Sequence, residues 1–454
     1  MPGLPVGGLH TFFLRGKEME RVYQHCCGID IHKRILVACL ILVTADGQRH
    51  KEIRTFRTIT QDLLQLLDWL QANQCTHVAM EATGVYWKPL FNLLEGHVQV
   101  LVVNAQHIKA VPGRKTDVRD AEWIADLLQH GLLKASFIPP ATQRELRELT
   151  RYRTTLVEER ARIVNRLHKT LEDTNLKLGD VVTDILGKSA RAMLEALLAG
   201  QSDPVKLADL ARGRLKAKRA ELEQALVGTL KPHHRFLLKE HLAHIDTLDQ
   251  AMVRVGAEIA VLMRPLEQAE LSETHPDEPT PETQEQALTW AQAIVLLCSI
   301  PGISQRAAEG ILAEIGIEMK RFASAKHLAS WAGMSPGNRE SAGKRLSGKT
   351  NKGSPWLRKL LVEAALAASH TKHTYLAAQY KRLAARRGAK KAAIAVGHSI
   401  LVIIYQLLDQ HKSYEDLGGN YFDELDRQAI QKRLVRRLEK LGYEVELKPA
   451  LPAA

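Results

Sequence analysis

Strand-like and helical runs alternate near the start of the chain, and their order constrains the fold more than any other feature. β-rich runs come first, in GIDIHKRILVACLILV from Gly28 and in KEIRTFRTI after a break at Ala45, Asp46 and Gly47. The amphipathic QDLLQLLDWLQAN follows, and then THVAMEA, KPLFNLLEG, VQVLVVNA and DVRDAEWIADLLQH alternate between strand and helix patterns. The order is βββαβαβα, which predicts an antiparallel meander leading into βαβ units.

That order is typical of an α/β ribonuclease-H-like (RuvC-like) domain. After Pro139 and Pro140 the sequence becomes almost continuously helical, so we expect a long helical or coiled-coil middle and a mainly α C-terminal domain with a helix-hairpin-helix. The expected parts are a tail (1–22), the RuvC-like domain (23–140), a helical coiled-coil region (141–264), an acidic Pro-rich linker (265–288), a C-terminal domain (289–410) and a basic helical tail (411–454).

Residues that are apolar apart from one histidine recur every seven positions in the later part of the helical middle. The two rows are Leu238, Ile245, Met252 and Ile259, and His241, Leu248, Val255 and Leu262. Such a seam favours an intermolecular coiled coil. The alternative is packing within the chain, against the helix expected over 143–178.

Charge and cysteine content narrow the class of protein. The net charge of +12 favours a polyanionic partner. Five cysteines without a CxxC pair support neither a disulfide framework nor a zinc ribbon, so a reducing cytoplasm is expected. We find no stretch that approaches the 18 or so uncharged apolar residues of a membrane span.

Four acidic residues stand where a metal centre would need them. Asp30 interrupts the apolar first strand, where an unpaired carboxylate is costly to bury. Glu81 ends the strand VAMEATG, and Gly84 would let the backbone turn away from it. Asp117 and Asp120, three residues apart, share one helix face. Phosphoryl transfer uses divalent ions held by carboxylate oxygens, so we predict a site for Mg²⁺, or Mn²⁺, made by these four residues.

The three acidic blocks GIDIHK, MEATGVYW and KTDVRDAEWIADLL resemble those of the DEDD transposases of bacterial insertion sequences. This family shares a RuvC-like domain with Holliday-junction resolvases and includes the Piv-type invertases. The resemblance implies that Asp30, Glu81, Asp117 and Asp120 take the DEDD roles.

The C-terminal half contains two segments suited to nucleic acid. LLCSIPGISQRAAEGILAEIG resembles a helix-hairpin-helix, in which backbone N–H groups near a helix start bind a phosphate; an ordinary helical hairpin is the alternative. WAGMSPGNRESAGKRLSGKTNKGSPWLRKLL combines glycines with seven cations. The predicted nucleic-acid-binding residues are Lys115, Gly302, Ile303, Ser304, Arg339, Lys344, Arg345, Lys349, Lys352 and Arg358.

Hydroxyl groups stand among these cations, and an alkoxide there would be stabilised by positive charge. The candidates are Ser341, Ser347, Thr350 and Ser354, and chemistry alone does not choose between them. The segment resembles the C-terminal domain of the same transposase family, whose serine is implied to attack DNA. ESAGKR places Ser341 at that position, and a loop serine bonded to its own backbone is the alternative.

These features predict a transposase or site-specific recombinase that cleaves and rejoins DNA strands at the DEDD centre with Ser341 as nucleophile. The resemblance also implies guidance by an element-encoded structured RNA, and recombination of two duplexes predicts a dimer or tetramer. A metal-dependent nuclease or junction resolvase that uses water is the enzymatic alternative. A non-catalytic nucleic-acid-binding scaffold is the other, but four acids in a DNA-facing cleft would then only repel phosphate.

Overall fold

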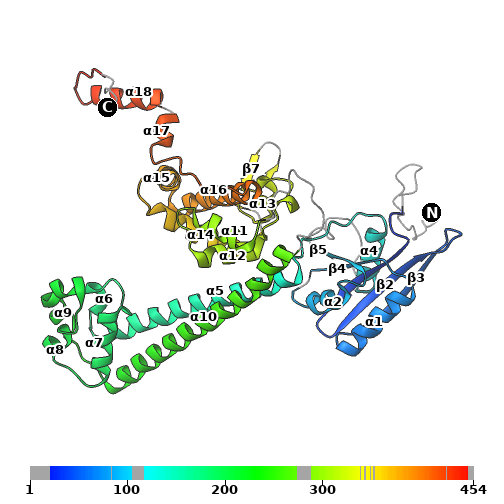
Figure 1. Cartoon of the computed structure of the whole chain (residues 1–454), viewed down its shortest axis with the longest axis horizontal. Helices are drawn as coiled ribbons and strands as arrows, with labels where there is room; N and C mark the ends of the chain where they lie inside the picture. The colour runs from blue at the N-terminus through cyan, green and yellow to red at the C-terminus, as the bar shows by residue number, and fades with distance from the viewer. Residues whose placement is uncertain are drawn as a thin grey trace, which may run out of the picture. The chain divides into compact units, whose positions relative to one another are not determined.

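The chain divides into two compact units in the computed structural model, Met1–Pro139 and Pro140–Ala454 (Figure 1). The structure describes residues 21–82, 84–104, 117–272, 288–337, 339–341, 344–347, 349–350, 353–425 and 427–447.

The first unit is built on a mixed five-stranded sheet of order β3-β2-β1-β4-β5. Its strands are β1 (His25–Ile31), β2 (Ile35–Val43), β3 (Arg49–Arg57), β4 (His77–Glu81) and β5 (Gln99–Val103). β1 to β3 pair antiparallel, whereas β1, β4 and β5 pair parallel. The expected succession of strands and helices is thus confirmed, and it is compatible with a ribonuclease-H-like domain.

Helices cover both faces of this sheet. Their bounds are α1 (Thr60–Ala72), α2 (Trp87–Leu94) and α4 (Asp117–Gln129). Alternate residues of β1 point to opposite faces, so Cys27 and Ile29 pack with α1 and α2 while Cys26 packs with α4. Burial raises the pKa of Cys26 and of Cys75 to about 12. These thiols are therefore neutral core side chains, and all five cysteines are free.

The second unit begins with two long helices, α5 (Ala141–Asp173) and α10 (Pro232–Ser272), which lie side by side (Figure 1). Short elements pack at one end of the pair, and their bounds are α6 (Leu178–Val181), α7 (Lys188–Leu198), α8 (Pro204–Ala208), the 3₁₀ helix η1 (Gly213–Lys218) and α9 (Arg219–Ala225). Their apolar side chains form one core with those of α5 and α10.

The sequence favoured an intermolecular coiled coil at the heptad seam, but the structure shows the seam packed within the chain. Ile245 and Ile259 are each 1% exposed, and Met252 is 9% exposed. Ile245 and Met252 share a core with Leu156 and Ile163 of α5, so the seam packs within the chain. The physical reason is that a heptad row specifies an apolar stripe without specifying which helix covers it. α10 also extends to Ser272, so helix occupies the first residues of the expected linker.

The remaining helices surround a second core. They are α11 (Trp290–Cys298), α12 (Gln305–Ile315), η2 (Met319–Arg321), α13 (Ala325–Trp331), α14 (Pro355–Ser369), α15 (Tyr375–Arg387), α16 (Ala389–Gln410), α17 (Tyr421–Leu425) and α18 (Arg427–Glu439). α16 is long and apolar enough to cross a membrane, contrary to the expectation from the sequence. Val396, Ile400 and Ile404 are nevertheless fully buried in this core, which gives α16 the burial pattern of a core helix.

Candidate active site and nucleic-acid interface

Asp30 and Glu81 lie side by side at the carboxyl end of the parallel strands. The register pairs Gly28 with Ala79 in β1 and β4 and ends at the next pair, one residue before Asp30 and Glu81. Gly28 and Ala79 face α4. Since side chains alternate along a strand, Asp30 and Glu81 point to that same face.

The first turn of α4 lies over this edge of the sheet. The Val22 amide donates to the Gln129 carbonyl at 2.8 Å, which places the end of α4 beside the start of β1. A Cβ at Gly28 would stand 2.4 Å from the Ala121 oxygen. Asp117 precedes Ala121 by about one helical turn, ~6 Å, and Asp30 follows Gly28 by a similar length of strand. The structure therefore brings the start of α4 to the Asp30 edge.

Gly28 positions the two sides of this edge and was not among the predicted site residues. A Cβ there would also stand 2.2 Å from the Ala125 amide nitrogen, so only glycine lets α4 cross the strand this closely. The signal was present in the sequence, as a glycine in an apolar strand and small residues four apart, Ala121 and Ala125, on the helix.

Asp30 is 8% exposed and lies beside His32, another residue that the sequence reasoning missed. The His32 Nε2 atom is 3.1 Å from Asp30 Oδ2. Two residues apart at the end of a strand, these side chains fall on one face, and this spacing was the available signal. Glu81 and Asp120 are both partly buried. The side chain of Asp117 lies outside the described residues.

The acids at this edge are the right chemical type for a hard divalent cation. Mg²⁺ and Mn²⁺ take carboxylate oxygens, and Asp30, Glu81 and Asp120 offer only such oxygens. Among the residues that the structure describes, no three acidic, histidine or cysteine side chains lie close enough together to enclose an ion. The residues therefore fit a divalent metal by the chemistry of their oxygen donors and by their common position at this edge of the sheet.

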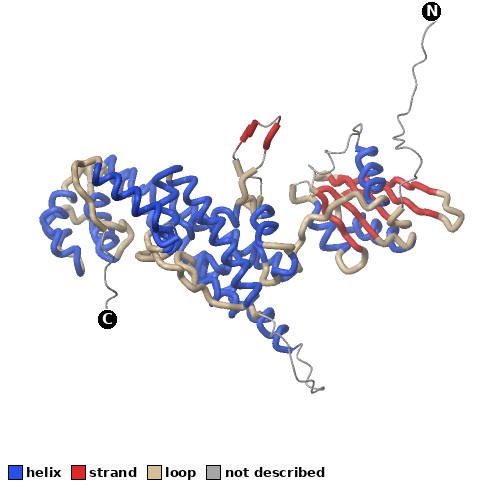
Figure 2. Tube along the Cα trace, turned by 90° about the horizontal axis from the view of Figure 1, so that it is seen from above, coloured by secondary structure: helices blue, strands red, loops and turns tan. Residues whose placement is uncertain are grey.

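In the second unit, Ser341 ends the first strand of a small β-hairpin that stands out from the helices (Figure 2). The strands are β6 (Arg339–Ser341) and β7 (Lys344–Ser347), and Ser341 pairs with Lys344. Below them, the Gly337 amide donates to the Lys349 carbonyl at 2.9 Å. The hairpin backbone thus brings the predicted nucleophile and a predicted phosphate-binding cation to the same end of the two strands.

Tight contacts hold the base of the hairpin. A Cβ at Gly353 would stand 2.3 Å from the Gly333 amide nitrogen, so the two ends of the segment touch. Arg358 Nη2 donates to the Gly333 carbonyl at 2.7 Å, which gives this predicted DNA contact a structural bond. Ser354 caps α14 and its hydroxyl donates to Glu314 at 3.1 Å. The Ser354 hydroxyl is thereby engaged in structural hydrogen bonds.

The predicted helix-hairpin-helix segment forms a helical hairpin of α11 and α12. Gly302 has a φ of +91°, and a Cβ there would lie 2.4 Å from the Ala364 oxygen of α14. The Ile303 side chain is 7% exposed, and its amide donates to the Ile300 carbonyl at 3.1 Å. Ser304 is exposed and caps α12. This packing favours the ordinary helical hairpin, and a phosphate contact at Gly302 and Ile303 stays only a prediction.

The other predicted nucleic-acid contacts are described only in part. Lys349 is exposed. Lys115 and Lys352 lie outside the described residues, as do the side chains of Ser341 and of three hairpin cations, Arg339, Lys344 and Arg345.

Two transposase family models match this chain. The first, described as a DEDD transposase of the IS110 type, matches residues 27–176, and the second, described as the transposase IS116/IS110/IS902 family, matches residues 295–381. These segments contain the sheet with its acidic edge and the hairpin with Ser341.

Two curated proteins are also similar. The transposase for insertion sequence element IS1111A of Coxiella burnetii is 23% identical over 394 residues, which cover 85% of this chain and 90% of that protein. An uncharacterized 43.6 kDa protein of insertion element IS110 in Streptomyces coelicolor is 28% identical over 240 residues, or 51% of this chain and 55% of that protein. With both family models matched in order along one chain, this protein belongs to the IS110-type DEDD transposases, the DNA-processing enzymes of bacterial insertion sequences.

Proposed function

We propose that this transposase cleaves and rejoins DNA strands at a Mg²⁺ centre held by Asp30, Glu81, Asp117 and Asp120, with Ser341 as the nucleophile. The observation that carries the proposal is the shared sheet edge, where Asp30 and Glu81 face the start of α4. Bound divalent ions would supply charge neutralisation at the scissile phosphate. The protein's own part is to fix the carboxylates and to present the hydroxyl.

The chemical step exchanges one phosphoester for another. The Ser341 oxygen forms a bond to the scissile phosphorus as the bond from phosphorus to the leaving deoxyribose oxygen breaks. The serine proton passes to solvent or to a carboxylate, and the leaving oxygen takes up a proton. Attack by the hydroxyl of the new strand reverses these changes and releases Ser341. The phosphoserine link keeps the strand attached and conserves the energy of the phosphodiester.

Cations of the hairpin support the proposal from the other unit. Lys344 pairs with Ser341 across the two strands, so a positive residue accompanies the nucleophile in the same short hairpin. Arg345 follows it directly. Positive charge at this place would stabilise the developing charge on the phosphate oxygens. The metal-dependent nuclease alternative uses the same acids with water and gives Ser341 no role.

The family supports DNA as a partner, and the other partners are part of the proposal. We infer that the protein acts in the bacterial cytoplasm, that a homo-oligomer joins two duplexes, and that the hairpin of one protomer serves the acids of another. Guidance by a structured RNA of the element is part of this proposal. It is supported by the family membership and by the net charge of +12.

The test of the nucleophile is to trap the reaction on a nicked suicide substrate and look for a denaturant-resistant protein–DNA adduct. We expect an adduct mapped to Ser341 by mass spectrometry, its loss in Ser341→Ala, and its retention in the matched variant Ser347→Ala. Strand exchange by Ser341→Ala at the wild-type rate, without an adduct, would favour the water-using nuclease.

A further inference from the structure

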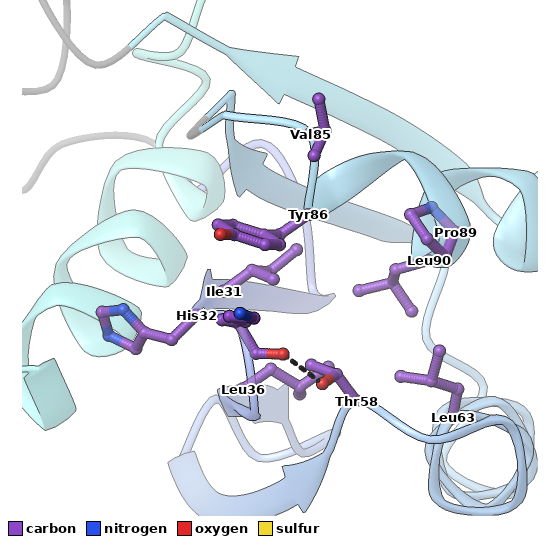
Figure 3. A pocket seen from close by; sticks show the side chains of 10 residues that line it. Ile31, His32, Leu36, Thr58, Leu63, Val85, Tyr86, Pro89 and Leu90 are labelled. Atoms are coloured by element: carbon purple, nitrogen blue, oxygen red, sulfur yellow. Dashed lines mark hydrogen bonds between the residues drawn. The ribbon is translucent and has the colours of Figure 1, made fainter.

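A small pocket opens at the Asp30 edge of the sheet, on the face that α1 and α2 cover (Figure 3). Its volume is about 180 Å³. Ile31, Leu36, Leu63 and Leu90 form its apolar walls and are each less than 9% exposed. Tyr86, from the turn that leads into α2, stands at its side next to Ile31 (Figure 3).

The pocket adjoins the proposed metal centre through one residue. His32 contributes to the pocket lining, while its imidazole points away from the pocket (Figure 3) and reaches Asp30. The carboxylate of Asp30 and the pocket therefore lie on opposite sides of the same strand end. In the complex proposed above, a DNA strand whose phosphate binds at Asp30 would pass the strand end that also borders the pocket.

Hydrogen bonds preform the wall that the two sites share. The Thr58 hydroxyl donates to the Lys33 carbonyl at 2.8 Å, and the Thr58 amide donates to the Arg34 carbonyl at 3.0 Å. Within the turn, the His32 amide donates to the Ile35 carbonyl at 2.9 Å. The turn between β1 and β2 is thus held by the protein's own hydrogen bonds.

The exposed side chains and the positive charges at the mouth of the pocket indicate which class of ligand it would bind. Tyr86 is 40% exposed and Val85 is 63% exposed, so an aromatic ring and an apolar group stand open to solvent there. Lys33 and Arg34 are exposed on the turn beside them. Apolar walls with an aromatic ring suit the faces of a nucleobase, and neighbouring cations suit its phosphates. A peptide would gain nothing from those cations unless it were acidic.

We propose that this pocket receives an unstacked nucleobase adjacent to the scissile phosphate and that the Tyr86 ring is its stacking platform. The location relative to the scissile phosphate rests on the proposed function. An extruded base is held in a snug pocket and stacks between aromatic or apolar side chains, and its extrusion here would fix the adjacent phosphate relative to the carboxylates. Tyr86 would then be a substrate-binding residue that positions DNA for cleavage.

The experiment is a thermodynamic cycle between the Tyr86 ring and the base. The full-length protein, with any RNA that purifies with it, is titrated with a duplex that carries the mapped cleavage site, and Ca²⁺ replaces Mg²⁺. A second set of duplexes has an abasic nucleotide at one of the two positions on either side of that site. We expect Tyr86→Ala to weaken binding of the intact duplex about tenfold or more. On the duplex that lacks the contacted base, the same substitution should have little effect, because the two losses share one interaction.

Two further variants serve as matched controls. Tyr86→Phe keeps the ring and should bind as the wild type does. Leu64→Ala removes an exposed apolar side chain of the same unit outside the pocket and should also leave binding unchanged. Equal losses for Tyr86→Ala on intact and on all abasic duplexes would overturn the proposal. So would a change of oligomeric mass in Tyr86→Ala with unchanged DNA affinity, which would assign the pocket to a protein segment.

Failure of this inference is separable from failure of the proposed function. The binding cycle is measured in Ca²⁺ and needs no cleavage, whereas the metal centre is tested by the cleavage rate of Asp30→Ala. Wild-type cleavage by Asp30→Ala with a non-additive Tyr86 cycle would reject the metal centre and keep the base pocket. The reverse pair of results would reject the pocket alone.

Discussion

Glu314 shows how a single side chain holds together the domain that carries the proposed nucleophile. Its side chain is 2% exposed, and Arg151 donates to both of its carboxylate oxygens, at 2.6 and 2.9 Å. Arg147 donates to the Glu314 carbonyl at 2.6 Å, and the Ser354 hydroxyl donates to its carboxylate. Because these residues come from α5, α12 and the start of α14, one carboxylate ties the long helix to the base of the hairpin that carries Ser341.

Glu314→Ala is expected to destabilise the protein by about 3 kcal/mol, because it leaves the partly buried guanidinium groups of Arg147 and Arg151 without their carboxylate. The measurement is the urea midpoint of the full chain. The matched control is Glu159→Ala on α5, which removes a carboxylate whose side chain is 42% exposed and whose oxygen is 3.8 Å from an Arg162 nitrogen. An exposed pair of this kind contributes ~0.5 kcal/mol or less. Equal midpoints for the two variants would contradict the role assigned to Glu314.

The strands and helices of the first unit were predicted correctly from the alternation of apolar and polar residues. Alternation of β-rich and amphipathic runs predicted every element from β1 to β5 in order, because each run buries one or both faces in its own unit. The crossing of α4 at Gly28 was not predicted, since close helix–strand approach depends on residues nearly a hundred positions apart. For the α10 seam, the helix over 143–178 was named only as the alternative partner, because a heptad row does not specify which helix covers it.

The packing of α10 against α5 leads to a prediction about folding. Ile245→Ala should destabilise the second unit by about 2 to 5 kcal/mol, because it empties space in a buried core. Val253 lies on the same helix and is 70% exposed, so Val253→Ala should have little effect on stability. Circular dichroism melts test both variants, and light scattering reports assembly. A dimer that dissociates in Ile245→Ala with unchanged helix melting would restore the intermolecular seam.

The net positive charge of the whole protein can be read directly from its sequence. Lys and Arg number 63 against 51 Asp and Glu, and cations cluster in the segment with Ser341. A protein that contacts many phosphates releases counterions on binding, so its affinity falls as salt rises. With about six such contacts, we expect affinity for duplex DNA to fall about a thousandfold between 50 and 200 mM salt.

Fluorescence anisotropy with a labelled duplex measures this dependence. Lys349→Ala, at an exposed cation beside the hairpin, should lower the salt slope by about one. Lys206→Ala, at an exposed cation of α8, serves as the matched control and should leave the slope unchanged. An affinity that stays constant across this salt range would contradict binding through the DNA backbone.

The proposed metal centre, held by carboxylates at one sheet edge, is tested by the rate at which Asp30→Ala cleaves DNA. Strand cleavage is measured in Mg²⁺ for the wild type, for Asp30→Ala and for Asp68→Ala, which removes an exposed acid on α1. We predict that Asp30→Ala loses about 100-fold or more in rate, the equivalent of about 3 kcal/mol, while its melting temperature and the rate of Asp68→Ala stay near wild type. Cleavage by Asp30→Ala at the wild-type rate would show that Asp30 does not hold a catalytic metal.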